Sequence, residues 1–424
     1  MSLNYPATLE DWLQHLEARN RESIVLGLDR VASVRDRLGL HPDFVVISVG
    51  GTNGKGSVCA YLEAVLTAAN YRIGCYVSPH LLRYNERVHI DGREATDTEL
   101  CQALAAVEDA RGEIPLTYFE QGTLAAMWLF QRAGLDAAIL EVGLGGRLDA
   151  VNAWDADCAI VTSVDLDHQQ FLGDTREAIG YEKAGIFRAN RPAICGDANP
   201  PASLLAHAGA IGAQLRCMGE AIHVDVADPG VMDWRCRIET EVLPALPRLT
   251  MPGRHQYLNA SSALAALWSL RERLPVSMSA VRAGLGAARQ PGRFQVVARQ
   301  PLQILDVAHN PQAARALAEN LADLPPGGEV IGVCAMLADK DVAAVVEILK
   351  PYIGFWHVAG LNIPRGLDVQ GMAGFMSGAG CAHECHDEVA QAWRAACFRA
   401  KPADTILIFG SFHTVAAVME AMQC

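Results

Sequence analysis

The segment GGTNGKGS, residues 50–57, combines glycines with one lysine and two hydroxyl side chains. It follows the apolar run 44–49, and apolar residues recur at helical spacing from Ser57 onward. Backbone N–H groups of such a turn, and the N-terminus of the helix after it, attract phosphate oxygens. Lys55 would pair with β- and γ-phosphates, and the Ser57 hydroxyl stands where a Mg2+ ligand is expected. A phosphate loop is therefore predicted. Gly56 departs from the Walker pattern, and an ordinary glycine-rich turn is the alternative.

Three more residues could do chemistry in such a site. Glu141 lies near the end of the apolar run 136–142, and a carboxylate at the carboxyl end of a parallel strand faces the ligand crevice. We expect it to bind Mg2+, with an exposed loop acid as the alternative. His168 follows the apolar run 158–164, but a lone histidine is more often structural. For Lys183, the sequence context alone favours the surface of a helix.

Strands and helices alternate around these residues. Nearly continuous apolar strands that alternate with helices indicate a parallel sheet covered on both faces. The expected strands are 44–49, 73–77, 136–142, 158–164, 192–196, 302–307, 329–334, 353–358 and 404–409. The expected helices are 97–111, 120–132, 175–188, 258–274, 277–288, 311–322, 341–350, 387–400 and 412–422.

The length of 424 residues favours two domains. A Pro-Gly segment at 289–295 lies between an expected helix and a new strand, and we place the boundary there. The predicted fold class is α/β. An N-terminal P-loop ATPase-type doubly wound domain (1–290) precedes a smaller C-terminal Rossmann-like α/β domain (291–424). Residues 197–250 show period-2 stretches, so we expect added β-structure there.

Charge and composition exclude several classes of protein. The net charge of -13 gives no electrostatic footprint for nucleic acid. With 51% hydrophobic and 20% charged residues, the chain is globular rather than disordered. The 12 cysteines lie mostly inside apolar runs, as small buried side chains in a reducing compartment do. Neither a signal-like start nor an apolar run of membrane-spanning length is seen, so we expect a cytoplasmic protein without membrane contact.

The segment CAHECH, residues 381–386, offers two cysteines and two histidines. No second ligand pair at zinc-finger spacing follows it, and the gap between its cysteines is only marginally typical of such sites. A structural zinc site is therefore not predicted for this segment.

Ten further segments, spread from residue 23 to residue 415, carry a resemblance to a known family. They are SIVLGLDRV (23–31), YVSPHL (76–81), LTYFE (116–120), EVGLGGRLDA (141–150), DLDHQQFLG (165–173), EKAGIF (182–187), PGRFQ (291–295), DVAHNP (306–311), MLADKD (336–341) and FGSFHTV (409–415). With GTNGKGS, their order and spacing resemble the Mur ligase superfamily. The pattern looks most like its folate branch, the folylpolyglutamate synthases that also act as dihydrofolate synthases.

The resemblance implies an ATP-dependent ligase that joins L-glutamate to dihydropteroate and then to reduced folates. A carboxylate does not react with an amine at neutral pH, because oxide is a poor leaving group. Transfer of the γ-phosphoryl group of ATP creates an acyl-phosphate that does react. The alternatives are a folylpolyglutamate synthase alone, a Mur-type amino-acid ligase for another carboxylate, and a P-loop ATPase that works through partners. Small-molecule substrates and a monomer are implied.

The resemblance also implies the residues of the site. For ATP these are Thr52, Asn53, Gly54, Lys55, Gly56, Ser57, Asn259, Arg293 and Asp306. For two Mg2+ ions they are Ser57, Ser78, Glu141 and His168. Catalytic roles fall to Lys55, His168 and Lys183. Lys183 resembles a lysine that reacts with CO2 to form a carbamate, which requires a neutral, desolvated amine.

The pterin substrate is expected at three loops that match those of the family. Their residues are Ser23, Ile24, Val25 and Leu26; Thr117, Tyr118, Phe119 and Glu120; and Leu148, Asp149 and Ala150. Phe119 could stack on an aromatic ring, although core packing is equally open for it, and Asp149 could accept pterin N–H groups. His309 and His413 are expected near the glutamate end of the site.

Overall fold

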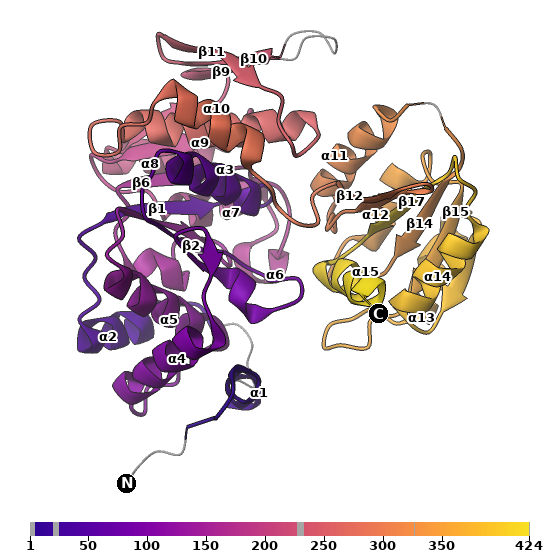
Figure 1. Cartoon of the computed structure of the whole chain (residues 1–424), viewed down its shortest axis with the longest axis horizontal. Coiled ribbons are helices and arrows are strands. Elements are labelled where there is room, and N and C mark those ends of the chain that lie inside the picture. The colour runs from indigo at the N-terminus through magenta and orange to yellow at the C-terminus, as the bar shows by residue number, and fades with distance from the viewer. Residues whose placement is uncertain (1–4, 20–24, 227–232, 326, 424) are drawn as a thin grey trace. The chain divides into compact units, whose positions relative to one another are not determined.

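The computed structural model describes residues 5–19, 25–226, 233–325 and 327–423 (Figure 1). The chain divides into two compact units. The first consists of Met1–Thr250 with Tyr257–Ala288, and the second of Met251–Gln256 with Arg289–Cys424. Among the described residues, no helix is both long enough and apolar enough to cross a membrane.

The first unit is built on an eight-stranded sheet in the order β4-β3-β2-β5-β1-β6-β7-β8. Six neighbouring strands, from β2 to β8 in that order, are parallel, and β3 and β4 add an antiparallel edge. The strands are β1 (Val45–Gly50), β2 (Ile73–Tyr76), β3 (Val88–Ile90), β4 (Arg93–Glu94), β5 (Ala137–Glu141), β6 (Cys158–Val161), β7 (Pro192–Cys195) and β8 (Gln214–Cys217). All six residues of β1 are buried, which fits a central strand covered on both faces.

Helices cover both faces of this sheet. On one face α3 packs against α10, and on the other α2, α4 and α5 pack together (Figure 1). The helices of this unit are α1 (Leu9–Arg19), α2 (Asp29–Leu38), α3 (Lys55–Ala68), α4 (Asp97–Arg111), α5 (Tyr118–Ala133), α6 (Gln169–Leu172), α7 (Arg176–Ala184), α8 (Ala202–Ile211), α9 (Arg254–Ser269) and α10 (Met278–Ala287). Two short 3-10 helices, η1 (Tyr84–Arg87) and η2 (Ala150–Ala153), lie in the connections.

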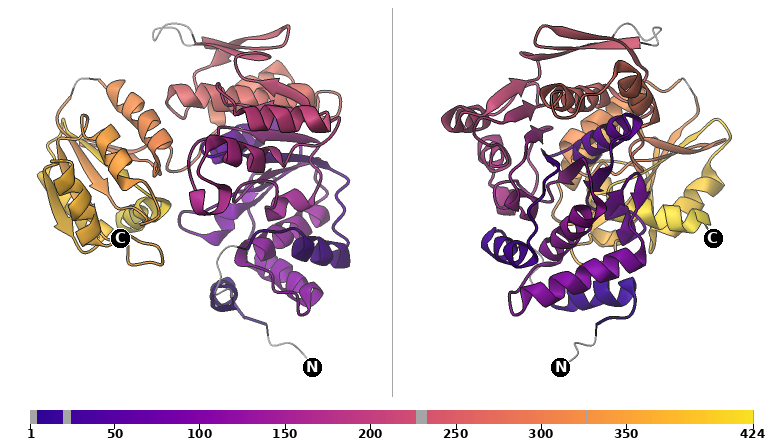
Figure 2. Two further views of the ribbon diagram at one scale, coloured as in Figure 1. Left: turned by 180° about the vertical axis from the view of Figure 1, so that it is seen from behind. Right: turned by 60° about the vertical axis from the view of Figure 1, so that its left-hand side comes forward.

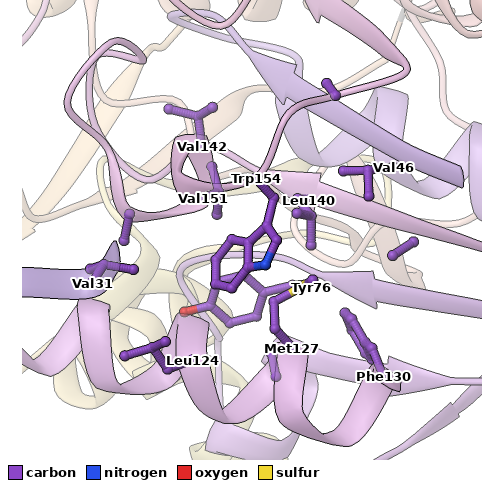
Figure 3. Close-up of a cluster of buried hydrophobic side chains, with 14 of the residues drawn as sticks. Val31, Val46, Tyr76, Leu124, Met127, Phe130, Leu140, Val142, Val151 and Trp154 are labelled. Atoms are coloured by element: carbon purple, nitrogen blue, oxygen red, sulfur yellow. The ribbon is translucent and has the colours of Figure 1, made fainter. Parts of the chain in front are cut away.

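An apolar core lies between the sheet and α5. Figure 3 shows the rings of Trp154 and Tyr76 at its centre, close to Met127 of α5. Trp154 is 4% exposed, and its Nε1 donates to Leu40 O at 3.0 Å. The polar edge of the largest ring is thus satisfied, so its burial costs no unpaired donor.

A small antiparallel sheet, in the order β11-β10-β9, packs beside α10 (Figure 2). Its strands are β9 (Ile222–Val226), β10 (Asp233–Ile238) and β11 (Glu241–Pro247). Burial alternates along β10, as expected of a sheet with one covered face. This is the added β-structure expected between residues 197 and 250.

The second unit holds a six-stranded sheet in the order β12-β13-β17-β14-β15-β16, parallel except for β12. Its strands are β12 (Gln295–Arg299), β13 (Leu302–Leu305), β14 (Val330–Cys334), β15 (Phe355–Ala359), β16 (His383–His386) and β17 (Thr405–Phe409). Its helices are α11 (Pro311–Ala322), α12 (Val342–Leu349), α13 (Val369–Gly378), α14 (Val389–Arg399) and α15 (Phe412–Gln423). The core of this unit joins α11, α12 and α13 to one sheet face, and α14 packs with α15 and on β14, β15 and β17.

The predicted α/β class is confirmed, and each expected strand is present with small changes at its ends. The expected helices at 97–111 and 311–322 match α4 and α11 at both ends. The antiparallel edge of β3 and β4 was not predicted, because strands of two or three residues leave too short a pattern to read.

Candidate active site

The phosphate loop, residues 50–57, lies at the carboxyl end of β1, between β5 and β6 in the sheet. Gly54 has a φ of +86°, a conformation that side chains other than glycine rarely adopt. A Cβ on Gly54 would lie 2.5 Å from Oδ1 of Asn259 in α9. Glycine is therefore required for this close approach, which brings Asn259, the asparagine expected to contact ATP, against the loop.

The segment that follows β6 holds the phosphate loop in place. Asn53 N donates to Ser163 Oγ at 3.1 Å, and Thr162 Oγ1 donates to Asn53 O at 2.6 Å. Thr52 Oγ1 donates to Asp165 O at 3.1 Å and accepts from Asp165 N at 3.0 Å. The segment after β6 thus fixes the loop backbone, and sequence reasoning gave no role to Thr162 or Ser163.

Lys55 and Ser57 open α3. The Nζ atom of Lys55 donates to Gly51 O at 3.0 Å and to Thr52 O at 3.2 Å, so the ammonium lies against the loop. Ser57 is 1% exposed. Positive charge from Lys55 and from the N-terminus of α3 is concentrated at this turn, which suits phosphate oxygens.

Glu141 is the last residue of β5, and it pairs in register with Val49 of β1. It is 4% exposed, so the alternative of an exposed loop acid is wrong. Its Oε2 atom accepts from Ser78 N at 3.0 Å. Ser78 follows β2, so the segments that carry Ser78, Glu141 and Ser57 leave three adjacent strands. Carboxyl ends of parallel strands share one edge, and these oxygen-bearing residues are thereby gathered at it.

His168 follows β6, on the other side of β1, and caps the N-terminus of α6 with a φ of +52°. Its backbone N donates to Asp167 Oδ1 at 2.8 Å, and its Nε2 lies 3.9 Å from the same oxygen. A left-handed conformation is uncommon outside glycine and is often found at functional sites.

Lys183 in α7 is 4% exposed, so the surface position favoured by sequence alone is wrong. Burial and, to a smaller extent, the charge of Lys55 lower the pKa of Lys183 to about 7. Asp167 and Asp149 act in the opposite direction. Among the described residues, Lys183 forms no ion pair or hydrogen bond through its side chain. A substantial neutral fraction at neutral pH follows, which is what reaction with CO2 requires.

Two of the three loops expected to hold the pterin meet through Asp149, Gly143 and Phe119. Asp149 Oδ2 accepts from Leu144 N at 2.8 Å and Oδ1 accepts from Val151 N at 3.1 Å. Burial raises the pKa of Asp149 to about 7. A Cβ on Gly143 would lie 2.6 Å from Cζ of Phe119, so the loop runs directly along the Phe119 ring.

Arg30, which sequence reasoning missed, connects the same loops to the first. Its Nη2 donates to Val25 O at 2.7 Å and to Glu120 Oε1 at 2.8 Å. Gly27 N donates to Leu148 O at 3.3 Å. Val25 and Leu26 therefore lie beside the other two loops, whereas Ser23 and Ile24 lie outside the described residues. Glu120 also accepts from Thr117 N at 2.7 Å as part of a capping box.

The second unit has its own polar cluster where β13 ends. Asp306 Oδ2 accepts from Phe294 N and Oδ1 accepts from Ala308 N, both at 2.8 Å. Burial raises the pKa of Asp306, and the neighbouring Arg293 opposes this. His309 Nδ1 lies 2.8 Å from Val307 O. Arg293 and Asp306, both expected to contact ATP, are thus neighbours.

Comparison with known proteins decides the family. The Mur ligase middle domain matches residues 49–267, and the glutamate ligase domain of the Mur ligases matches residues 292–412. The first match alone covers more than half of the chain. This chain belongs to the Mur ligase family.

Relatives place it in the folate branch of the Mur ligases. The dihydrofolate synthase/folylpolyglutamate synthase of Escherichia coli is 46% identical over 416 residues, which span 98% of this chain and 96% of that protein. The protein of the same name from Haemophilus influenzae is 40% identical over 98% of each chain. The resemblance seen in the sequence is confirmed, and so is the class of ATP-dependent ligase.

Solved structures of Mur ligases agree in fold. FolC of E. coli in complex with DHPP and ADP superimposes with a TM-score of 0.93 at 46% identity, covering 98% of both chains. A bifunctional folylpolyglutamate synthase/dihydrofolate synthase with Mn, AMPPNP and L-glutamate bound gives a TM-score of 0.91 at 44% identity, covering 99% of this chain and 98% of that one. The roles of individual residues in this Mur ligase stay predictions.

Proposed function

We propose that this chain uses ATP to join L-glutamate to dihydropteroate, giving dihydrofolate, and then adds glutamate to reduced folates. Its Mur ligase family membership and its similarity to bifunctional enzymes over nearly the full length support this reaction. The observation that carries the proposal is local. The phosphate loop and the buried Glu141 share one edge of the first sheet. The buried Lys183 lies against the loop that follows Glu141, because a Cβ on Gly146 would lie 3.0 Å from Lys183 O.

ATP would be held by the phosphate loop, residues 52–57, together with Asn259. The N–H groups and Lys55 oppose the charge of the phosphates, and the Asn53 and Thr52 tethers keep the loop from rearranging on binding. A binding site whose donors are already oriented loses little free energy to ordering. We propose residues 1–290 as the ATP- and pterin-binding domain.

For residues 291–424 we propose nucleotide contacts at Arg293 and Asp306. Arg293 carries the positive charge expected of a phosphate contact, and Asp306 would reach the sugar region. The backbone N–H bonds that fix Asp306 keep its carboxylate oriented.

The donor set at the sheet edge fits Mg2+. Glu141 supplies a buried carboxylate, and Ser57 and Ser78 supply hydroxyls, which are the hard oxygen ligands that Mg2+ prefers. His168 completes the proposed set for two ions. When bound, Mg2+ supplies charge neutralisation at the phosphates.

The chemistry proceeds in two displacements. One carboxylate oxygen of the pterin substrate attacks the γ-phosphorus, the bond to the β–γ bridging oxygen breaks, and ADP leaves. The uncharged amine of glutamate then attacks the acyl carbon, phosphate leaves with that carboxyl oxygen, and the nitrogen loses a proton. Lys55 would stabilise the phosphoryl group during its transfer, because its charge already lies at the loop.

Lys183 would carry a carbamate in the working enzyme. A neutral amine attacks CO2, a C–N bond forms and a proton leaves, so a cation becomes an anion. The reaction suits this position because Lys55 then faces an opposite charge rather than a like one. The low pKa of Lys183 and its burial support the proposal.

Dihydropteroate would lie against the three connected loops. Phe119 offers a ring face, and the Arg30 contacts hold Val25 and Glu120 around it. Asp149 is bonded by its own loop, so it would meet the pterin N–H groups as a fixed acceptor. Since the substrates are small molecules, we propose a monomer that acts in the cytoplasm.

The test is phosphate release with purified protein, ATP and Mg2+. We expect little release from ATP alone or with dihydropteroate alone, and full release when L-glutamate is added, with dihydrofolate found by mass. Reduced folate and glutamate should then give the diglutamate. Release that ignores both additions would identify a P-loop ATPase instead, and activity with reduced folate only would leave the folylpolyglutamate synthase alternative.

A further inference from the structure

Two histidines and a glutamate meet at the edge of the second sheet. His357 of β15 pairs in parallel register with Glu384 of β16. His386 lies two residues beyond Glu384, so its side chain points to the same face of the sheet. His383 and Cys385 point to the opposite face for the same reason. Cys385 therefore lies on the face opposite the cluster, and the third member of the cluster is His357 of the neighbouring strand.

The three side chains converge at distances that suit one metal ion. Nδ1 of His357 lies 3.0 Å from Nε2 of His386, and the carboxylate of Glu384 lies 3.7 Å from the first and 4.0 Å from the second. A tetrahedral Zn2+ ion with bonds of about 2.0–2.2 Å holds its ligand atoms roughly 3.3–3.5 Å apart. The observed distances lie on both sides of this value, so shifts of a few tenths of an ångström would complete the site.

The three side chains of the cluster differ in their exposure to solvent. The side chain of His357 is 2% exposed and that of His386 is 10% exposed, whereas that of Glu384 is 58% exposed. Burial lowers the pKa of His357 to about 4. An ion could enter past Glu384 and keep water as a fourth ligand. Two imidazole nitrogens favour Zn2+ over Mg2+ or Ca2+.

We propose that His357, Glu384 and His386 bind one Zn2+ ion, which fastens the edge strand β16 to β15. The ion would take the place of the proton that the two rings share at 3.0 Å. In this sheet β15, β14 and β17 separate β16 from β13, where Asp306 follows. At about 4.8 Å per strand, β13 and β16 lie roughly 19 Å apart. The proposed zinc site is therefore separate from the cluster around Asp306.

Arg399 is the cation that acts on the cluster from α14. It lowers the pKa of His357, and its guanidinium stacks 3.8 Å over the ring of Phe355. It also pairs with Glu329 at 3.7 Å. The Glu384 carboxylate opposes this positive charge at His357 and supplies the negative charge that a divalent ion requires.

The test is Zn2+ affinity of the full chain, measured by competition with a coloured chelator in excess Mg2+ and ATP. Wild-type protein should bind one more equivalent than His386→Ala. Glu384→Gln keeps the shape of an exposed side chain, so folding is secure, and it should weaken binding about tenfold. Cys385→Ser and His383→Ala, on the opposite face of the same strand, should bind as wild type does.

Two further readouts identify the ligands. Co2+ in place of Zn2+ should give visible tetrahedral bands without the near-ultraviolet absorption of a thiolate, and His386→Ala should lose them. Zn2+ at about 100 times its dissociation constant should raise the Tm of the second unit by about 5–10 °C in wild type but not in His386→Ala. Equal affinity in wild type and His386→Ala, loss of the ion in Cys385→Ser, or no binding at all would each overturn the proposal and leave a hydrogen-bonded pair of histidines.

Discussion

The carboxyl edges of the two parallel sheets carry buried charge in different ways. In the second unit Asp306 is held by two backbone N–H groups at 2.8 Å, so its carboxylate serves to fix the turn after β13. In the first unit Lys183 is 4% exposed and has no such partner among the described residues, and its pKa falls to about 7. A satisfied buried charge shapes a loop, whereas an unsatisfied one is free to react. We therefore expect Lys183 to take part in the chemistry, whereas Asp306 first of all holds the turn after β13.

The largest expected effect comes from Lys55→Ala. Turnover should fall by about 1000-fold or more, because the charge that meets the phosphoryl group is lost. The fold should be retained, since Lys55 bonds only to carbonyls of its own loop. Phosphate release and circular dichroism measure both. Turnover close to wild type would show that the phosphate loop takes no part in phosphoryl transfer, and the contrast between the two units would then fail.

Lys183→Ala should lower turnover by about 100- to 1000-fold, because the carbamate anion cannot form. Lys183→Arg should be as inactive, since a guanidinium does not react with CO2. The exposed Lys401→Ala is the control and should behave as wild type. A crystal of the wild-type protein grown in bicarbonate should show electron density for a carbamate on the Lys183 side chain. Full activity in the arginine variant would contradict the carbamate.

Asp306→Ala should affect stability. It leaves the N–H groups of Phe294 and Ala308 without their acceptor, which costs about 2–4 kcal/mol for the second unit. The exposed Asp323→Ala should cost less than about 0.5 kcal/mol. Denaturant unfolding of both variants measures the difference. A stability loss no greater than that of the control would show that the carboxylate does not fix the turn.

The pH dependence of the free energy of unfolding tests whether Lys183 is desolvated in the folded protein. Its pKa is about 7 when folded and 10.5 ordinarily, so between these values the unfolded chain binds more protons. Stability should therefore rise with pH in that window, by about 1 kcal/mol per pH unit from this group. The Lys183→Met variant should lack this component. Unfolding in CO2-free buffer from pH 7 to 10 tests it, and identical slopes would mean that the amine is not desolvated.

The smallest effect is expected at Phe119. Phe119→Leu should raise the KM for dihydropteroate by about 3- to 10-fold and leave the KM for ATP unchanged, because only stacking is lost. Phe398→Leu, at a side chain that is 95% exposed, is the control. An equal change in both KM values would show that Phe119 supports the fold near Gly143 rather than the pterin.

Sequence reasoning worked best where chemistry and local pattern coincide. The apolar run 44–49 and the helical spacing from Ser57 onward predict a strand, a turn and a helix in that order. The turn that forms the phosphate loop could therefore be located without tertiary information. Glu141 was found because a carboxylate at the end of an apolar strand is unusual. The helix expected at 97–111 matches α4 at both ends, and the structure shows a capping box of Thr96 and Glu99 at its start.

What the sequence could not supply depends on contacts between distant segments. Lys183 reads as a surface residue because its burial comes from other elements. Arg30 carried no signal, since its partner Glu120 lies 90 residues away. The cluster of His357 and His386 depends on which strands are neighbours and in what register, and CAHECH on its own contains no sign of His357. Hydrophobic periodicity indicates which face of a strand is buried, but it does not indicate which strand lies beside it.

The central claim is that the site moves a phosphoryl group onto a carboxyl group, and isotope transfer tests it most directly. Dihydropteroate labelled with 18O in its carboxyl group should be turned over with ATP and glutamate, and the released phosphate examined by mass. The account predicts one 18O atom in each phosphate, because the leaving group carries the carboxyl oxygen away. Unlabelled phosphate alongside dihydrofolate would contradict it.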